Sequence, residues 1–301
     1  MKLLILYGVY EAEKPFAPHA VCKCLNILKE HDIDVFITDD ASPSFLGERL
    51  KTVIKKQAIA QNVHIWRIEK STGFRGAMER TIGAFKRIAS MDTLYDFVIR
   101  LDSDVHFCRN DLDRIFNSKR MEKIGVWGEL LKMRYRDFIL YIVDAIMPFG
   151  FKRKQKDEKY EHKWEFSRFK SVWWSDIGRK ALLNGFRGVF VPGSFQIIAG
   201  QTILDMSKQG WLTRENSPLG LVFGEDVITN TMALALNHPV RSIRELVPDW
   251  SCELFISPNE TVDSIKNQGH FFIHPLKDTP WAHALRSAFD FHIDGLDQYF
   301  K

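Results

Sequence analysis

The chain has 301 residues, 45% of them hydrophobic, and a formal net charge of +4. This is enough apolar material for one large α/β domain or two small ones, and we expect a single domain over residues 1–301. The mildly basic charge suits an anionic ligand or membrane surface, but it is too small for a nucleic-acid-binding protein.

The four cysteines (Cys22, Cys24, Cys108 and Cys252) lack the spacing of a zinc site, and so few fit a reducing compartment. The apolar run at residues 3–7 is too short for a secretory signal and predicts a first strand. No run approaches the roughly 18 apolar residues of a membrane span. We therefore expect a cytoplasmic protein, soluble or peripheral on the inner face of the membrane.

The first 106 residues alternate between short apolar runs and helical patterns. The expected strands are 2–7, 34–38, 63–68 and 95–101, and the expected helices are 18–30, 48–60 and 76–90. Such alternation predicts parallel strands joined by right-handed crossovers. By fold analogy, residues 1–106 would form a nucleotide-binding type of half-sheet.

Residues 130–170 have a different character, with eleven lysines and arginines, six acidic residues and nine aromatic residues. Residues 134–147 fit an amphipathic helix, and the basic run Lys152-Arg153-Lys154 follows. We expect an inserted segment with one of two roles. It is either a membrane-surface element through residues 134–156, or a helix and solvated loop that cover the ligand site.

The second half, residues 171–301, begins with loop chemistry around Pro192-Gly193. Helical patterns follow at about 200–209 and 225–236. The tail at 270–281 contains His270, His274, Lys277 and Trp281.

Acidic pairs stand at three points along the chain. Asp39-Asp40 follow the second expected strand, Asp102-Ser103-Asp104 follow the fourth, and Glu225-Asp226 open an expected helix. Ligands of open α/β sheets bind at the carboxyl edge of the strands. Carboxylates gathered there repel one another unless a cation, usually a hard divalent metal, lies between them.

Each acidic pair has a structural interpretation beside the functional one. Asp102 and Asp104 could bind Mg²⁺ or Mn²⁺, or form a polar turn that caps a helix near residues 110–116. Asp226 could be a general base, or a residue favoured by the helix dipole.

The nucleotide side has the same two interpretations. Asp39 could accept hydrogen bonds from a base or ribose, or form an Asx-type turn. Tyr7 and Tyr10, just past the first strand, could pack on the base, although each tyrosine alone is more often plain packing.

In this order the motifs resemble those of the GT-A-fold glycosyltransferases, most nearly glycosyltransferase family 2. The matching segments are Val-Phe-Ile-Thr-Asp-Asp-Ala-Ser at 35–42, Gly-Phe-Arg-Gly-Ala at 73–77, Asp-Phe-Val-Ile-Arg-Leu-Asp-Ser-Asp at 96–104 and Gly-Glu-Asp-Val at 224–227. The resemblance covers roughly residues 2–106 and 193–240. It implies an α/β, mostly parallel sheet flanked by helices, with a nucleotide-sugar-binding half in 1–106 and an acceptor-binding half in 171–301.

The resemblance also implies an activity: metal-dependent transfer of a hexosyl group from a nucleotide-diphosphate sugar to a glycan or glycolipid hydroxyl, as in polysaccharide biosynthesis. No nucleic-acid partner is implied. Asp104 with Asp102 would bind Mn²⁺ or Mg²⁺, and a late histidine, His274 rather than His270, would complete the metal shell.

The remaining implied roles concern the substrates. Asp39 and Asp40 would contact the base, Asp226 beside Glu225 would be the catalytic base of an inverting enzyme, and Ser103, Arg75 and Lys277 would lie along the donor.

Two departures and two rivals qualify this interpretation. The chain has no Gln-x-x-Arg-Trp sequence, so processive polysaccharide synthases match poorly, and its tail is more like other GT-A branches. A haloacid-dehalogenase-like phosphatase would instead use Asp102 as a covalent nucleophile, although four βα elements precede that residue here. A nucleotide-sugar-binding protein without catalysis is the second rival.

Overall fold

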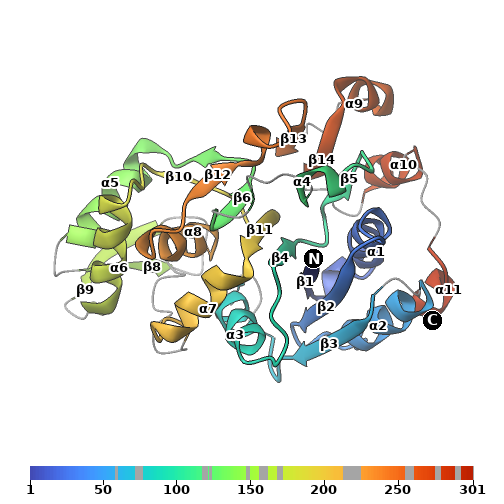
Figure 1. Ribbon diagram of the computed structural model, residues 1–301, viewed down its shortest axis with the longest axis horizontal. Coiled ribbons are helices and arrows are strands. Elements are labelled where there is room, and N and C mark those ends of the chain that lie inside the picture. The colour runs from blue at the N-terminus through green and yellow to red at the C-terminus, as the bar shows by residue number, and fades with distance from the viewer. Residues whose placement is uncertain are drawn as a thin grey trace.

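The computed structural model describes residues 1–300 apart from 58–59, 72–76, 117–120, 122–123, 147–149, 156–161, 168–171, 213–224, 255–260, 275–278 and 289–292. A seven-stranded sheet forms its centre (Figure 1). In spatial order its strands are β12 (Val240–Ser242), β6 (Val126–Gly128), β11 (Phe195–Ala199), β4 (Phe97–Leu101), β1 (Lys2–Val9), β2 (Asp32–Asp39) and β3 (Asn62–Arg67).

In the described part of the chain, three smaller sheets accompany the central one. They comprise β13 (Ser251–Leu254), β14 (His270–His274) and β5 (His106–Phe107); β10 (Val189–Phe190) and β7 (Leu131–Lys132); and β8 (Gly150–Gln155) and β9 (His162–Ser167).

The described helices cover both faces of the central sheet. The α-helices are α1 (Ala17–Ile27), α2 (Leu46–Lys56), α3 (Ala77–Ala89), α4 (Asp113–Phe116), α5 (Tyr135–Ile146), α6 (Val172–Leu183), α7 (Gly200–Lys208), α8 (Glu225–Ala235), α9 (Val262–Gln268), α10 (Pro280–Ala288) and α11 (Leu296–Phe300). The described residues also form two 3₁₀ turns, η1 (Glu11–Glu13) and η5 (Ile243–Glu245).

Strand direction confirms the predicted fold class. β3, β2, β1 and β4 are mutually parallel, as the alternation of strands and helices predicted. β11 is antiparallel to both of its neighbours, β4 and β6, and β12 is parallel to β6. The sheet is therefore mostly parallel, and the carboxyl ends of β1, β2 and β4 meet at one edge.

Alternating side chains of the strands build one apolar layer on each face of the sheet. In β1, Leu3, Ile5 and Tyr7 belong to a buried cluster with α1 and α2. Leu4 and Leu6 face the other way and join a cluster with α3, α7 and α8. Helices on both faces explain why the parallel strands read as continuous apolar runs.

The inserted segment is partly as predicted. The expected helix is present as α5, but β8 and β9 pair as an antiparallel hairpin where a solvated loop was expected. His-Lys-Trp-Glu-Phe-Ser at 162–167 alternates charged and aromatic residues, and this period of two is the strand signal that the basic composition obscured. No helix among the described residues is long and apolar enough to cross a membrane.

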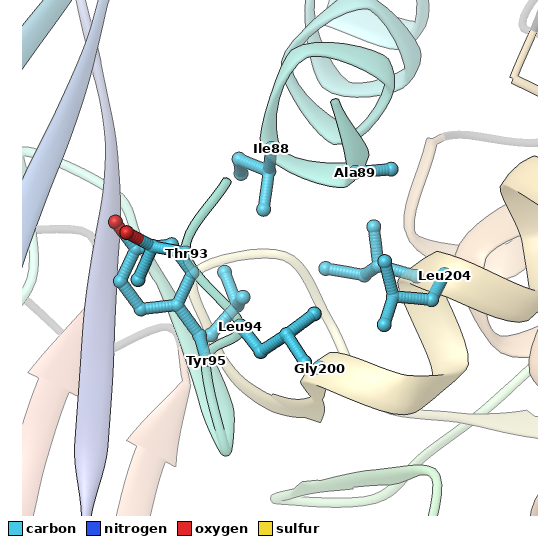
Figure 2. Close-up of a pocket in the computed structure, with 9 residues that line it drawn as sticks. Ile88, Ala89, Thr93, Leu94, Tyr95, Gly200 and Leu204 are labelled. Atoms are coloured by element: carbon cyan, nitrogen blue, oxygen red, sulfur yellow. The ribbon is translucent and has the colours of Figure 1, made fainter. Parts of the chain in front are cut away.

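A small apolar pocket lies at the amino end of β4, opposite the acidic edge. Figure 2 shows Ile88 and Ala89 of α3 facing Leu204 of α7, with Thr93 to Tyr95 closing one side. The start of α7 packs on the segment before β4, where the Gly200 amide donates to the Asp96 carbonyl at 2.9 Å. The lining offers no charged group, so the pocket belongs to the packing of α7 rather than to a polar ligand site.

Gly200→Ala is expected to lower the free energy of unfolding by about 1–3 kcal/mol. A Cβ at this position would lie 1.9 Å from the backbone carbonyl oxygen of Tyr95, so the start of α7 must move away from β4. Urea denaturation would measure the loss. Gln201→Ala, one residue on and exposed, should stay within about 0.5 kcal/mol of the parent; equal effects would contradict the backbone contact.

Candidate active site

Three side chains that could ligate a metal meet just past β4. The nearest imidazole nitrogen of His274, Nε2, lies 3.0 Å from Asp104 Oδ1 and 4.0 Å from Asp102 Oδ2. One ligand atom from each residue can be chosen so that all three lie within 4.8 Å of one another. Asp102 and Asp104 are the aspartates that the sequence analysis assigned to a metal.

Strand pairing explains how a tail histidine reaches these aspartates. β14 runs antiparallel to β5, with Ile273 opposite His106 and Phe272 opposite Phe107. Because the pairing is antiparallel, His274 continues toward Val105 and Asp104, the residues just before β5. His270 stands at the other end of β14, where its ring contacts the Gln268 amide oxygen, and it is not part of this group.

The donor set suits a hard divalent cation. Asp104 is nearly buried, with 4% of its side chain exposed, whereas 43% of Asp102 is exposed. Two carboxylates and one imidazole at this spacing provide oxygen and nitrogen ligands that Mn²⁺ accepts, and the exposed side leaves room for ligand oxygens and water. Ser103 between them is buried, and its Oγ lacks a hydrogen-bond partner in the described structure.

The loop before β11 connects Asp226 to this group. The backbone amide of Asp102 donates to the Ser194 carbonyl at 3.0 Å, so residues 192–194 lie against the aspartate turn. Asp226, in the first turn of α8, pairs with Arg100 of β4 at 3.3 Å between Oδ1 and Nη1. Asn230 donates to the Asp226 carbonyl at 2.7 Å and to the Val191 carbonyl at 2.9 Å, which ties α8 to the same loop.

Asp39 has a structural task that the sequence analysis gave as the alternative. Its carboxylate accepts from the Ser42 amide and hydroxyl at 2.8 and 2.9 Å, which makes the Asx-type turn. It also accepts from the Gly47 amide at 3.0 Å, one of the first-turn donors of α2 that have no partner within the helix. Contact with a nucleotide base stays a prediction for this buried residue.

Asp40 is also buried, and it ties two later segments to the end of β2. It accepts from the Ser71 hydroxyl at 2.9 Å and pairs with Arg80 of α3 at 3.2 Å. The second aspartate of the pair thus joins the ends of β2 and β3 to α3, at the edge where a nucleotide is expected.

Tyr7, near the end of β1, and Tyr10, just past it, lie in different surroundings. Tyr7 is fully buried, and its hydroxyl donates to the Ala17 carbonyl. Burial, followed by the negative charge of Glu13, raises the pKa of Tyr7 well above its usual value. A buried ring offers no face to a base, so we leave Tyr7 out of the site; Tyr10 is exposed and remains a candidate.

Some predicted site residues lie outside the described residues. Arg75 and Lys277 fall in the undescribed ranges 72–76 and 275–278, and the side chain of Glu225 is likewise not described. Their assigned roles stay predictions.

The structure adds residues that the motifs did not single out. Arg100 is a charged residue within the apolar strand Phe-Val-Ile-Arg-Leu, and that interruption was the available signal. Phe45, exposed and with a positive φ of 53°, carries the Arg67 guanidinium 4.0 Å above its ring. It stands just before α2, near the carboxyl end of β2, and its bulky side chain is unusual for this backbone conformation.

Sequence comparison finds neither a known family nor a curated protein that matches the chain.

Solved structures do resemble the chain. They include the apo structure of the bifunctional glycosyltransferase WbbM (TM-score 0.50, 11% identity), where the match covers 99% of this chain and 51% of that chain. A second is the mannosyltransferase PcManGT from Pyrobaculum calidifontis in complex with GDP-Man and Mn²⁺ (TM-score 0.43, 11% identity), where the match covers 98% of this chain and 66% of that chain. A third is S. aureus TarS 1-349 (TM-score 0.45, 13% identity), where the match covers 99% of this chain and 69% of that chain.

The chain spans about half the length of the first of these structures, with which it shares one residue in nine. At this identity the likeness concerns the fold, and it agrees with the mostly parallel seven-stranded sheet and its flanking helices. The chain therefore has a GT-A-like fold, the fold that its motifs predicted.

Proposed function

We propose that this protein is a metal-dependent glycosyltransferase. It would transfer a hexosyl group from a nucleotide-diphosphate sugar to a hydroxyl of a glycan or glycolipid, as a step of polysaccharide biosynthesis. The observation that carries the proposal is the group formed by Asp102, Asp104 and His274 at the carboxyl edge of the sheet, with Asp226 held in the first turn of α8 by Arg100.

The donor nucleotide would lie along the carboxyl ends of β1 and β2. Tyr10 would offer a ring to the base, and Asp39 and Asp40 would shape the surrounding loop or reach the base after a local change. Arg75 and Lys277 would meet the diphosphate, since both are cationic and flank this edge in the sequence.

Asp104, Asp102 and His274 would hold Mn²⁺ or Mg²⁺. When bound, the cation would offset the negative charge of the departing diphosphate. Asp226 would accept the proton of the acceptor hydroxyl as that oxygen attacks the anomeric carbon, which inverts its configuration. In the same displacement the nucleoside diphosphate leaves with the electron pair of the bond that joined its phosphate oxygen to the anomeric carbon.

A thermal-shift panel tests this function directly. The panel holds UDP-glucose, UDP-N-acetylglucosamine, GDP-mannose and the free nucleotides, each with Mn²⁺, Mg²⁺ or EDTA. A ligand at about 100 times its dissociation constant adds about 2.7 kcal/mol to stability, which is readily measured. We expect one nucleotide sugar to raise the melting temperature, and only when metal is present. The same nucleotide sugar should then donate its sugar to methyl hexosides in a transfer assay.

Other results would point elsewhere. The absence of a shift with every nucleotide would contradict the transferase and favour the phosphatase with Asp102 as nucleophile, which phosphorylation of Asp102 would reveal. A metal-dependent shift without turnover on any acceptor would favour the nucleotide-sugar-binding protein.

The membrane is the proposed site of the acceptor, reached through residues 134–156. Tyr135 and Ile139 lie one helical turn apart on α5 and are 80% and 40% exposed, beside the exposed Arg134. An aromatic and aliphatic face flanked by basic residues suits the surface of an anionic bilayer.

Tyr135→Ser/Ile139→Ser is expected to lower co-sedimentation with vesicles that contain phosphatidylglycerol at least several-fold, because it removes the apolar contact. Leu94→Ser is the control, since Leu94 is an apolar side chain that is 70% exposed but lies at the pocket before β4, away from α5. An intact protein that does not bind these vesicles would overturn the membrane contact.

A further inference from the structure

Arg100 is a buried charge at the centre of the sheet. In β4 it stands opposite Leu6 of β1 and Gln196 of β11, both buried, and only 9% of its own side chain is exposed. Removing a guanidinium from water is costly unless it is paired and hydrogen-bonded. An apolar residue would be more stable at this position of the strand, so packing alone does not explain the arginine.

Arg100 forms an ion pair with Asp226. The Arg100 Nη1 lies 3.3 Å from Asp226 Oδ1. The pair is only half enclosed, because 26% of the Asp226 side chain remains exposed while its arginine is buried. One end of the pair is thus anchored in the sheet and the other is accessible from outside.

Gly193 makes this arrangement sterically possible. A Cβ on residue 193 would lie 2.2 Å from Asp226 Oδ1 and 2.6 Å from Cζ and Nη1 of Arg100. Gly193 is not among the described glycines with a positive φ, so its lack of a side chain, not backbone freedom, is what the position uses. The backbone at 193 therefore closes over the pair.

The same loop contacts the aspartate turn. Ser194, the next residue, accepts the Asp102 amide at 3.0 Å, and Val191 is bonded to Asn230 of α8. The backbone of α8 at Asp226 is held by Asn230 as well. The elements around Asp226 thus fix its backbone, and Arg100 fixes its carboxylate.

We propose that Arg100 is a positioning residue, which orients the Asp226 carboxylate toward the acceptor hydroxyl, with Gly193 providing the close approach. The inference rests on the proposed function, because it assigns Arg100 a task in that same transfer step. Arg100 does not touch the substrates; it acts through Asp226. A misplacement of a reacting group by about 1 Å can cost on the order of 100-fold in rate.

The test compares Arg100→Gln, Arg100→Lys and Gly193→Ala in the full chain, with the nucleotide sugar that gives the largest shift in the panel above. We expect kcat to fall about 10- to 100-fold for Arg100→Gln and Gly193→Ala. The donor KM should stay within about threefold of the wild-type value, and the donor should still raise the melting temperature as it does for wild type. Arg100→Lys should recover part of the loss, because it keeps the charge without the planar fork.

Arg244→Gln is the matched control. It removes another arginine–carboxylate pair, with Glu129 at 2.9 Å, from an exposed position beyond β12. This variant should keep the wild-type kcat. If Arg100→Gln instead weakens donor binding and stability while kcat of the bound enzyme is unchanged, the pair is structural and the proposal fails.

A double-mutant cycle decides whether Arg100 acts through Asp226. If it does, Arg100→Gln/Asp226→Asn should be no slower than Asp226→Asn alone. If the losses in kcat of the two single variants multiply in the double variant, the inference is overturned while the proposed function stays intact. A wild-type protein that transfers no sugar would overturn the proposed function. An Asp226→Asn variant with full activity would show that Asp226 is not the catalytic base. Either result would overturn this inference as well.

Discussion

Asp104→Ala is expected to abolish the metal-dependent part of nucleotide-sugar binding and to lower turnover on the order of 10²–10³-fold. Asp104 is the most enclosed of the three candidate ligands and lies 3.0 Å from His274, so its removal opens the group at its centre. The thermal shift produced by the nucleotide sugar should then become the same in Mn²⁺ and in EDTA. Isothermal titration with Mn²⁺ alone would measure the loss of metal affinity separately.

Asp92→Ala is the control for this variant. Asp92 is exposed and lies before β4, at the opposite edge of the sheet, so the same substitution there should change neither metal affinity nor turnover. An Asp104→Ala protein that still responds to Mn²⁺ with wild-type affinity would remove Asp104 from the metal site. Retained turnover in EDTA would show that the reaction needs no metal.

Asp226→Asn is expected to lower kcat by about 10²–10⁴-fold while the donor-induced thermal shift stays near that of wild type. Asparagine has the shape of aspartate and can still accept from Arg100, but it cannot take the proton of the acceptor. The proposed role therefore predicts a loss in the transfer step rather than in donor binding. Initial rates at saturating donor and acceptor concentrations would measure it.

The product gives an independent check on Asp226. Proton NMR of the glycoside should show an anomeric configuration opposite to that of the donor if the enzyme inverts. A product that retains the donor configuration, together with an active Asp226→Asn variant, would exclude a single displacement assisted by this residue.

The first half of the fold was predictable because its information is local. From β1 to β4 each strand is an apolar run and each connecting helix has its own period, so the parallel order follows from the handedness of the crossovers. The positions of Asp39 at the end of β2 and of Asp102 just after β4 followed from the same pattern. Elements joined only by distant pairing, such as β11 between β4 and β6, carry no comparable local signal.

The candidate site was predictable in its aspartates but not in its assembly. Whether His270 or His274 meets Asp104 depends on the register between β14 and β5, and a shift of a few residues would exchange them. The pairing of Arg100 with Asp226 joins residues 126 positions apart. The task of Asp39 depends on the loop that precedes α2, where an Asx-type turn and a ligand contact use the same oxygens.

The antiparallel strand β11 has a consequence for how the chain can fold. β4 pairs with β1 on one side and with residues 195–199 on the other, so its second edge stays uncovered until the ribosome has released nearly 100 further residues. An uncovered apolar edge strand is a template for aggregation. The part of the chain up to β4 would therefore be a poor independent module. Nascent chains that end between β4 and β11 would depend on chaperones, because β4, which leads into the turn of Asp102 and Asp104, would still lack its second neighbouring strand.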